Sequence, residues 1–284
     1  MKGLTDAQVA IVGLGLMGGS LAGALRGRCQ AVVGVARRPG TIETALARGL
    51  IDRGTTDLAA SVRQTDVVIL ATPVRVILRL LTKIGPLLPK ECLLMDVGST
   101  KARIVTEMAR LPGHVQPLGG HPMCGREVSG IAAADPTLYQ GCTFVLTPPP
   151  RTSEAALALG RDLVEAIGAH PLVLDPEHHD RLVATISHLP YLLACGLVGT
   201  AEEVASADPT VWKVVASGFR KASRLAASDV TMMLDILLTN REAVLEALGT
   251  CEAQLSNLAR LVEAGDEEGL RAVLTAIRER RVRT

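Results

Sequence analysis

A histidine in a glycine-rich stretch offers general acid–base chemistry. His121 lies in "GGHPMCG", between two glycines and Pro122. Histidine changes its charge near neutral pH, so a histidine held in one position can take a proton from a substrate. The glycines and the proline predict a short, stiff turn that would hold the ring still. The alternative is a polar side chain that only decorates a loop.

Three other motifs carry polar side chains that could join His121 in a site. Ser99 lies in "DVGSTK", just past an apolar run that has the character of a strand. His188 lies in "SHLP", inside a helical stretch, and "GFRKASR" contains Arg220 and Arg224. Ligands collect at the carboxyl ends of parallel strands, which is where Ser99 is expected.

No metal site is expected. The neighbouring His178 and His179 would point about 100° apart on a helix, so we predict an exposed helix start for them. The chain has 6 cysteines, and no pair has the short two-residue spacing of a zinc or redox motif. They are expected to be reduced and partly buried.

The elements that must position these side chains begin with alternating strands and helices. Strands and helices alternate with the spacing of right-handed βαβ units, which predicts a parallel sheet covered on both faces. A helix at about 153–167 precedes the last strand. The expected strands are 9–12, 31–36, 66–72, 92–98, 143–150 and 170–175.

The second part of the chain is expected to be entirely helical. After Asp175 we find no strand pattern, only long stretches rich in alanine and leucine. The stretch 229–265 could form one long helix that ends at Gly265. Such a helix would protrude unless something packed along it, so the helical part is expected to dimerise. We therefore predict an α/β domain over residues 1–175 and an all-α domain over residues 176–284.

The stretch "GLGLMG" predicts a dinucleotide-binding loop. Gly13, Gly15 and Gly18 have the spacing G-x-G-x-x-G, directly after a strand and before a helix. The first glycine permits the tight turn, the second lets the backbone approach the pyrophosphate, and the third allows close packing of the helix. Leu16 and Met17 complete the candidate loop. The alternative is a turn that merely joins strand and helix.

The end of the second strand favours NADP over NAD as the cofactor. An NAD site usually has an acidic residue there, and this chain has Ala36 followed by Arg37 and Arg38. Without a carboxylate there is no repulsion of a 2′-phosphate, and arginine can pair with one. NAD stays open as the alternative, in which the arginines form a solvated turn.

Charge and composition exclude several classes of partner. There are 30 Lys and Arg residues against 29 Asp and Glu residues, a net charge of +1. This balance gives no electrostatic argument for nucleic acid or an anionic membrane. Aromatic residues make up only 2% of the chain, so base-stacking platforms are not expected. The first residues show neither a signal peptide nor a membrane span, and we expect a cytoplasmic protein.

In order and content, these motifs resemble those of the prephenate and arogenate dehydrogenases of tyrosine biosynthesis. The matching stretches are "GLGLMGGSLA", "ATP", "DVGSTK", "GGHPMCG", "SHLP" and "GFRKASR", and they extend over nearly the whole chain. The resemblance implies a Rossmann-like domain followed by a helical dimerisation domain. It implies an NAD(P)-dependent oxidative decarboxylation, in which the ring carbon bearing the 4-hydroxyl loses hydride and the ring loses CO2.

The resemblance also implies roles for individual residues. His121 matches the histidine that takes a hydrogen bond, and the proton, from the ring hydroxyl. Ser99 matches a serine that positions this hydroxyl and the nicotinamide, and Arg224 matches the residue that binds a substrate carboxylate. His188 would line the substrate pocket. Beside the cofactor the resemblance places Thr72 and Pro73.

Two positions depart from the family pattern. Cys124 stands where members often have alanine, which is a small change. Tyr191 stands where several prephenate-preferring members have a second histidine, and this puts the substrate side chain in question. Together with "GVARR" at the cofactor strand, it makes arogenate slightly favoured over prephenate.

Two alternatives come from other classes. The first is another two-domain hydroxy-acid dehydrogenase, such as the 3-hydroxyisobutyrate type. Those enzymes carry a lysine with an asparagine four residues later on the first helix of the second domain, and this chain has no lysine there. The second is a non-catalytic NADP sensor, which would not be expected to keep His121, Ser99 and Arg224 together.

Overall fold

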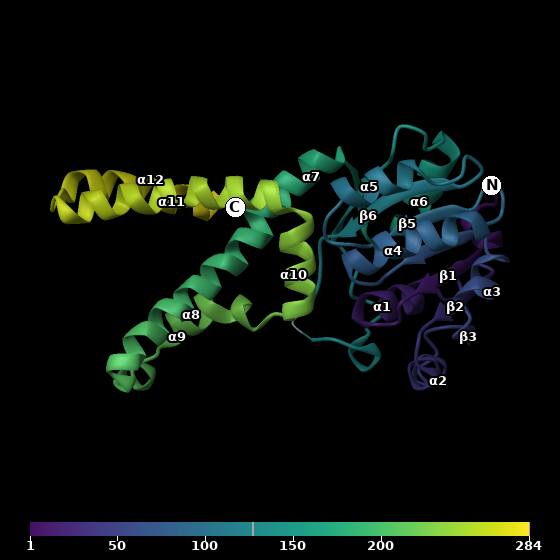
Figure 1. The fold of residues 1–284 in the computed structure, drawn as a ribbon, viewed down its shortest axis with the longest axis horizontal. Coiled ribbons are helices and arrows are strands. Elements are labelled where there is room, and N and C mark those ends of the chain that lie inside the picture. The colour runs from purple at the N-terminus through teal and green to yellow at the C-terminus, as the bar shows by residue number, and fades with distance from the viewer. Residues whose placement is uncertain (127, 284) are drawn as a thin grey trace.

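The first part of the chain forms an eight-stranded sheet with helices packed against it (Figure 1). The computed structural model describes residues 1–126 and 128–283. The strand order is β3-β2-β1-β4-β5-β6-β7-β8. The strands are β1 (Gln8–Val12), β2 (Ala31–Val35), β3 (Arg53–Thr55), β4 (Val67–Leu70), β5 (Leu93–Asp96), β6 (Gln116–Pro122), β7 (Thr143–Thr147) and β8 (His170–Val173).

The sheet differs from the expected one in two respects. Neighbouring strands are parallel except β6 and β7, which pair antiparallel, so the sheet is mixed and the expected all-parallel series is wrong at this point. Short β3 and glycine-rich β6 were not expected as strands, because neither has the apolar run that marks a buried strand. β3 and β6 are strands because they pair with the neighbouring strands of the sheet.

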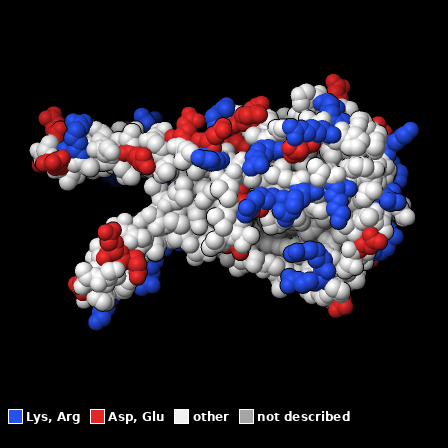
Figure 2. Space-filling model, viewed as in Figure 1, with Lys and Arg blue, Asp and Glu red and all other residues white. Residues whose placement is uncertain are grey.

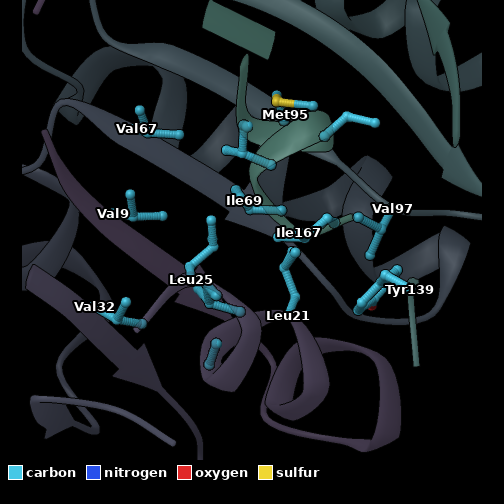
Figure 3. Packing of buried hydrophobic residues seen from close by; sticks show 14 of the residues in the cluster. Val9, Leu21, Leu25, Val32, Val67, Ile69, Met95, Val97, Tyr139 and Ile167 are labelled. Atoms are coloured by element: carbon cyan, nitrogen blue, oxygen red, sulfur yellow. The ribbon is translucent and has the colours of Figure 1, made fainter. Parts of the chain in front are cut away.

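Alternate residues of the central strands enter two different cores. Val9 and Ile11 of β1 pack into one core cluster, and Ala10 and Val12 of the same strand pack into the other. Side chains alternate across a strand, so a strand covered on both faces must be apolar throughout. Figure 3 shows the first cluster, with Tyr139 beside the helix residue Leu21.

Six α-helices connect and cover these strands. They are α1 (Leu16–Leu25), α2 (Pro39–Ala47), α3 (Leu58–Val62), α4 (Val74–Ile84), α5 (Ala102–Ala109) and α6 (Glu154–Ala166). The chain runs from β1 to β2 on one side and later returns to β4 on the other, so the strand order reverses at β1. A crevice forms at the carboxyl ends of the strands at such a switch point, and this is where nucleotides bind.

After β8 the described chain is helical, and two pairs of helices project as arms away from the sheet (Figure 1). One arm is formed by α8 and α9 and the other by α11 and α12. The helices are α7 (Pro176–Val183), a π-helical turn (Ala184–His188), α8 (Leu189–Ala207), α9 (Ser217–Ser223), α10 (Val230–Thr239), α11 (Arg241–Glu263) and α12 (Glu267–Arg283). Short 3-10 turns are Leu4–Asp6, Gly85–Leu87, Ile131–Ala133, Pro209–Lys213 and Arg224–Ala227.

The long helix expected over 229–265 is wrong. It is divided into α10 and α11 at Asn240, whose backbone leaves the helical conformation. The Asn240 side chain does not cap α11 but donates to the backbone carbonyl of Asp180 at 2.7 Å. The apolar periodicity continues through the break, so the pattern alone could not show it.

The continuous helical run Pro176–Ala207 is apolar enough to cross a membrane by length and composition, with a mean hydropathy of 1.6 over its best window. Its first turns pack against the sheet domain, with His179 and Asp180 buried, while apolar side chains further along α8 lie exposed. An exposed apolar face of this kind marks a surface that needs a cover.

Candidate active site

The loop between β1 and α1 has the geometry of a phosphate cradle. Gly13 has φ +104°, and a Cβ there would lie 2.5 Å from the Ala71 carbonyl oxygen. A Cβ on Gly18 would lie 1.8 Å from the Gly13 carbonyl oxygen, so both positions need glycine. A Cβ on Gly15 would meet nothing within 4 Å, which leaves open space at the first turn of α1. Backbone N–H groups there can bind a phosphate.

The remaining residues of the motif serve mainly the core. Leu16 is buried, and the half-buried Met17 packs against the core cluster that contains Val9 and Ile11. The Met17 carbonyl accepts a hydrogen bond of 2.8 Å from the Tyr139 hydroxyl. Leu16 and Met17 are therefore available to a cofactor through their backbone rather than their side chains.

Thr72 and Pro73 lie on the other side of this loop. The Thr72 methyl carbon would be 2.8 Å from a Cβ on Gly13, so the two residues are in contact range. The Thr72 hydroxyl is buried and has no hydrogen-bond partner within residues 1–126 and 128–283. Pro73 precedes α4. An unpaired buried hydroxyl calls for a ligand, so the observed residues fit a dinucleotide at this place.

The segment after β2 presents two free cations. Arg37 and Arg38 are exposed, directly after the half-buried Ala36, and neither side chain has a hydrogen bond or ion pair within the described chain. Figure 2 shows further Lys and Arg side chains over α4, which carries Arg75, Arg79 and Lys83. This face of the sheet domain is therefore electropositive and suited to a phosphorylated ligand.

His121 lies in a strand, so the turn expected around it is wrong. It is the sixth residue of β6 and pairs with Val145 of β7. The flanking glycines allow close packing rather than a tight turn. A Cβ on Gly120 would lie 2.6 Å from the Asp96 carbonyl oxygen, and one on Gly119 would lie 2.2 Å from the Thr147 hydroxyl. Pairing with β7, not a glycine turn, holds the backbone of His121 in place.

His179 is buried beside His121, so its expected place on an exposed helix start is wrong. Its side chain is 1% exposed, while His178 is exposed as predicted. His121 Nδ1 and His179 Nε2 are 2.8 Å apart, and the two rings meet edge to face at 76°. On the far side, His179 Nδ1 is 2.8 Å from Asp180 Oδ1. The 100° separation on α7 turns one histidine outward and the other into the domain seam.

Asp180 joins the helical part to the start of α5. Its Oδ1 accepts the Lys101 backbone N–H at 2.7 Å, and its Oδ2 accepts that of Ala102 at 2.9 Å. The first N–H groups of a helix have no partner inside the helix, and a carboxylate there is stabilised. The backbone carbonyl of Asp180 accepts a hydrogen bond from the side-chain amide of Asn240. Three elements thus meet at Asp180.

A buried ion pair supports the other side of His121. Lys101 Nζ contacts Asp96 and donates to the Gly120 carbonyl at 2.7 Å. Asp96 also accepts the N–H groups of Gly98 and Gly120, at 2.7 and 3.2 Å. The pair therefore fixes the segment before His121 and the segment that carries Ser99.

Burial governs the ionisation of this region. The pKa of His121 is lowered well below its usual value by burial first, and then by His179, Lys101 and His188. Burial lowers the pKa of His188 to about 4. It also raises the pKa of Asp96 and lowers that of Lys101, so each of these ions is maintained by its partner. His121 is therefore a neutral imidazole at neutral pH.

The other expected site residues lie in different settings. Ser99 is half-buried in the loop after β5, at the same edge of the sheet as His121. His188 is buried, with Nδ1 3.3 Å from the Asn240 amide nitrogen. Tyr191 is half-buried on α8, where a hydrogen bond with Cys195 raises its pKa. Arg224 is exposed at the start of a 3-10 turn that packs against α8.

Five residues of this network were not predicted from the sequence: Asp96, Lys101, His179, Asp180 and Asn240. A lysine within "DVGSTK" and an aspartate directly after a histidine pair were visible, but single charged residues usually lie at the surface. Within the described chain, no group of three or more His, Cys, Asp or Glu could hold a metal ion.

Two family models match this chain in succession. The model described as prephenate dehydrogenase, nucleotide-binding domain, matches residues 21–173. The model described as prephenate dehydrogenase, dimerization domain, matches residues 175–276. Prephenate dehydrogenase of Bacillus subtilis (strain 168) is 33% identical over 266 residues, which are 92% of this chain and 72% of that protein.

Solved structures of similar enzymes have the same fold. Prephenate dehydrogenase from A. aeolicus, in complex with hydroxyphenyl propionate and NAD+, has a TM-score of 0.93 at 33% identity over 99% of both chains. Synechocystis arogenate dehydrogenase has a TM-score of 0.85 at 31% identity, over 97% of this chain and 99% of that chain. 3-Hydroxyisobutyrate dehydrogenase from Salmonella typhimurium has a TM-score of 0.56 at 17% identity, a likeness of fold alone.

Proposed function

The chain belongs to the prephenate dehydrogenase family, and on this premise we propose that it catalyses the NAD(P)-dependent oxidative decarboxylation of arogenate or prephenate. The product is tyrosine from arogenate or 4-hydroxyphenylpyruvate from prephenate. The observation that carries the proposal is the setting of His121. It is a neutral imidazole held at the carboxyl edge of the sheet, on the same edge as the glycine loop and Ser99.

The chemistry requires a base for one proton. His121 accepts the proton of the ring hydroxyl as the carbon–oxygen double bond forms at that carbon. The same carbon releases a hydride, and the ring carboxylate leaves as CO2. The electrons of the broken C–C bond make the ring aromatic and convert the carbonyl to a phenolate, which takes the proton back from His121 to give the phenol of the product. A bound nicotinamide supplies the hydride acceptor. A general base must be unprotonated before it can accept a proton, and the lowered pKa of His121 keeps its imidazole in that form at neutral pH.

Three other residues position the substrate in this proposal. Ser99 donates to or accepts from the ring hydroxyl, and Arg224 holds a substrate carboxylate through its planar guanidinium. His188 shapes the pocket wall from a buried position between α7 and α8. Removal of a positioning contact lowers the rate because the reacting atoms leave their near-attack geometry.

We propose NADP as the preferred cofactor. Gly13, Gly15 and Gly18 form the pyrophosphate cradle, with Thr72 and Pro73 beside it. Arg37 and Arg38 are exposed and unpaired, and Ala36 removes the carboxylate that would repel a 2′-phosphate. NAD is the alternative.

Arogenate is the slightly favoured substrate. Arogenate carries an amino acid side chain and prephenate carries a keto acid, so the two differ in charge at one atom. Tyr191 stands where several prephenate-preferring relatives have a histidine. A neutral phenol there adds no positive charge beside the substrate amine. The inference rests on this residue and on the arginines at the cofactor strand.

The active form is proposed to be a cytoplasmic homodimer, with its division into domains near residue 175. The family description of residues 175–276 as a dimerization domain supports the dimer. A second copy would cover the apolar face of α8, because the buried His179, Asp180 and His188 at the start of the same helical run are unsuited to lipid.

One assay plate tests the activity. Both substrates are combined with both cofactors, and reduced nicotinamide is followed by absorbance, with His121→Asn as a control. We expect the highest kcat/KM with arogenate and NADP, and a fall in turnover of roughly 10²–10⁴-fold in the variant, with cofactor affinity kept. No turnover in any of the four combinations would contradict the proposal, and unchanged turnover in His121→Asn would end the role of His121.

A further inference from the structure

We infer that His179 and Asp180 are positioning residues that set the tautomer of His121, so that Nε2 is the nitrogen that accepts the substrate proton. This inference rests on the proposed function, because it describes how the proposed base is prepared. It follows from the line of contacts Asp180–His179–His121, in which both distances are 2.8 Å.

The direction of these hydrogen bonds follows from Asp180. Each of its carboxylate oxygens already accepts a backbone N–H at the first turn of α5. This setting stabilises a carboxylate, which can only accept hydrogen bonds. His179 Nδ1 must therefore carry the proton and donate it to Oδ1.

The remaining positions follow in turn. A neutral imidazole has one donor and one acceptor nitrogen, so a proton on His179 Nδ1 leaves a lone pair on Nε2. That lone pair accepts a hydrogen bond from His121 Nδ1–H. His121 then has its lone pair on Nε2, the nitrogen that faces away from His179. A carboxylate that orients a histidine in this way is a recurrent device of acid–base catalysis.

The hydrogen-bonded line Asp180–His179–His121, here called the relay, crosses between the sheet domain and the helical part of the chain. His121 lies in β6, and His179 and Asp180 lie at the start of α7. The Asn240 amide, at the junction of α10 and α11, donates to the Asp180 carbonyl and holds this turn in place. The His121 tautomer is thus determined only when the helical part is seated on the sheet.

The direct test is the tautomer of His121 in the intact wild-type protein. Nitrogen-15 chemical shifts of the imidazole rings are measured by NMR near pH 8, and His121 is assigned by the signals that disappear in His121→Asn. We expect a protonated Nδ1 and an unprotonated Nε2. A proton on Nε2 in the wild-type protein would overturn the inference, and this measurement does not depend on the folding of any relay variant.

Two substitutions of His179 separate the hydrogen bond from packing. His179→Gln keeps an acceptor near the Nε2 position, whereas His179→Leu removes it. We expect His179→Leu to lower kcat roughly 10²-fold, with KM and cofactor affinity changed by less than about threefold, and to mix the His121 tautomers. His179→Gln should recover to within about tenfold of wild type. The exposed neighbour His178→Leu is the matched control and should retain wild-type kcat.

The outcomes separate this inference from the proposed function. If His121→Asn loses turnover while folded His179→Leu keeps wild-type kcat and one tautomer, the relay is wrong and the proposed function stands. If His121→Asn keeps full turnover, the proposed role of His121 fails, and the wild-type tautomer no longer bears on catalysis.

Discussion

Lys101 illustrates how a single residue can organise the site without touching a substrate. It is fully buried, pairs with Asp96, and donates to the Gly120 carbonyl directly before His121. The loss of one partner would leave the other charge buried and uncompensated, which costs far more than the pair itself contributes. The ion pair is therefore a condition for the geometry around His121 rather than a source of stability.

Lys101→Met is expected to lower the free energy of unfolding by about 3–5 kcal/mol, because Asp96 loses its counter-ion inside the core. Urea-induced unfolding measures this free energy. Lys83→Met, at the exposed end of α4, is the control and should change the free energy by less than about 0.5 kcal/mol. Equal stabilities for the two variants would show that the buried pair has no such role.

Arg224 permits a test of substrate recognition at the residue scale. Arg224→Ala should raise the substrate KM at least tenfold with cofactor affinity unchanged, because the carboxylate loses a charge-assisted hydrogen bond. Arg224→Lys should restore the substrate KM only partly, since lysine lacks the planar guanidinium. Arg220→Ala, in α9 directly before this 3-10 turn, is the control. A parallel loss of affinity for substrate and cofactor would point to misfolding instead.

At the scale of elements, the β1–α1 loop makes different demands on its glycines. Gly18 has no room for a side chain, whereas Gly15 has open space next to it. The motif spacing therefore includes one position where the fold requires glycine and one position with room for a ligand. The sequence motif predicts the same division, with the second glycine beside the pyrophosphate and the third in close packing of the helix.

Gly18→Ala should destabilise the fold by more than about 3 kcal/mol, since its Cβ would collide with a backbone oxygen. Gly15→Ala should keep the wild-type melting temperature and weaken cofactor binding at least tenfold, because its Cβ enters the space left for the pyrophosphate. Thermal unfolding and cofactor titration measure the two effects. Wild-type cofactor affinity in Gly15→Ala would place the phosphates elsewhere.

At the scale of the whole molecule, the two arms leave apolar side chains exposed. Leu197 on α8 and Leu255 on α11 are 38% and 54% exposed. On the face that Figure 2 shows, charged side chains gather at the tips of both arms, and the surface between the tips and the sheet domain is largely uncharged. A patch of this kind indicates a protein interface, and the proposed homodimer would cover it.

The double variant Leu197→Glu/Leu255→Glu should therefore shift the protein from dimer to monomer in light scattering after size-exclusion chromatography. A buried carboxylate at an interface lacks a partner and is desolvated. Val282→Glu, near the end of the described chain, is the control variant for this shift from dimer to monomer. A monomeric wild-type protein would contradict the dimer itself.

The seam between sheet and helices also makes stability depend on pH. The pKa of His188 is about 4 in the folded chain against an ordinary 6.5, and that of His121 is lowered as well. Below pH 6.5 the unfolded chain binds these protons first, so stability is full above 6.5 and falls as the pH drops. For His188 the loss approaches about 3 kcal/mol near pH 4. Urea unfolding at pH 8, 6 and 5 should show this decline, and His188→Gln should reduce its slope.

By itself, the sequence determined the elements whose signals are local. Apolar runs predicted the buried strands, the glycine spacing predicted the loop after β1, and the alanine- and leucine-rich stretches predicted a helical second part. Motif order also singled out His121, Ser99 and Arg224. The strands, the loop and the helical stretches depend on a few neighbouring residues, whose periodicity and backbone freedom can be evaluated without the fold, and the three site residues depend on the resemblance in motif order.

Only the tertiary structure decided how His121 is held and oriented. Its partner His179 lies 58 residues further along the chain, and Asn240 reaches Asp180 from 60 residues away. β6 is a strand because β5 and β7 pair with it, and α10 ends where Asn240 turns its side chain to the seam. Hydrogen bonds between distant segments leave no periodic pattern, since each needs only one suitable side chain at each end.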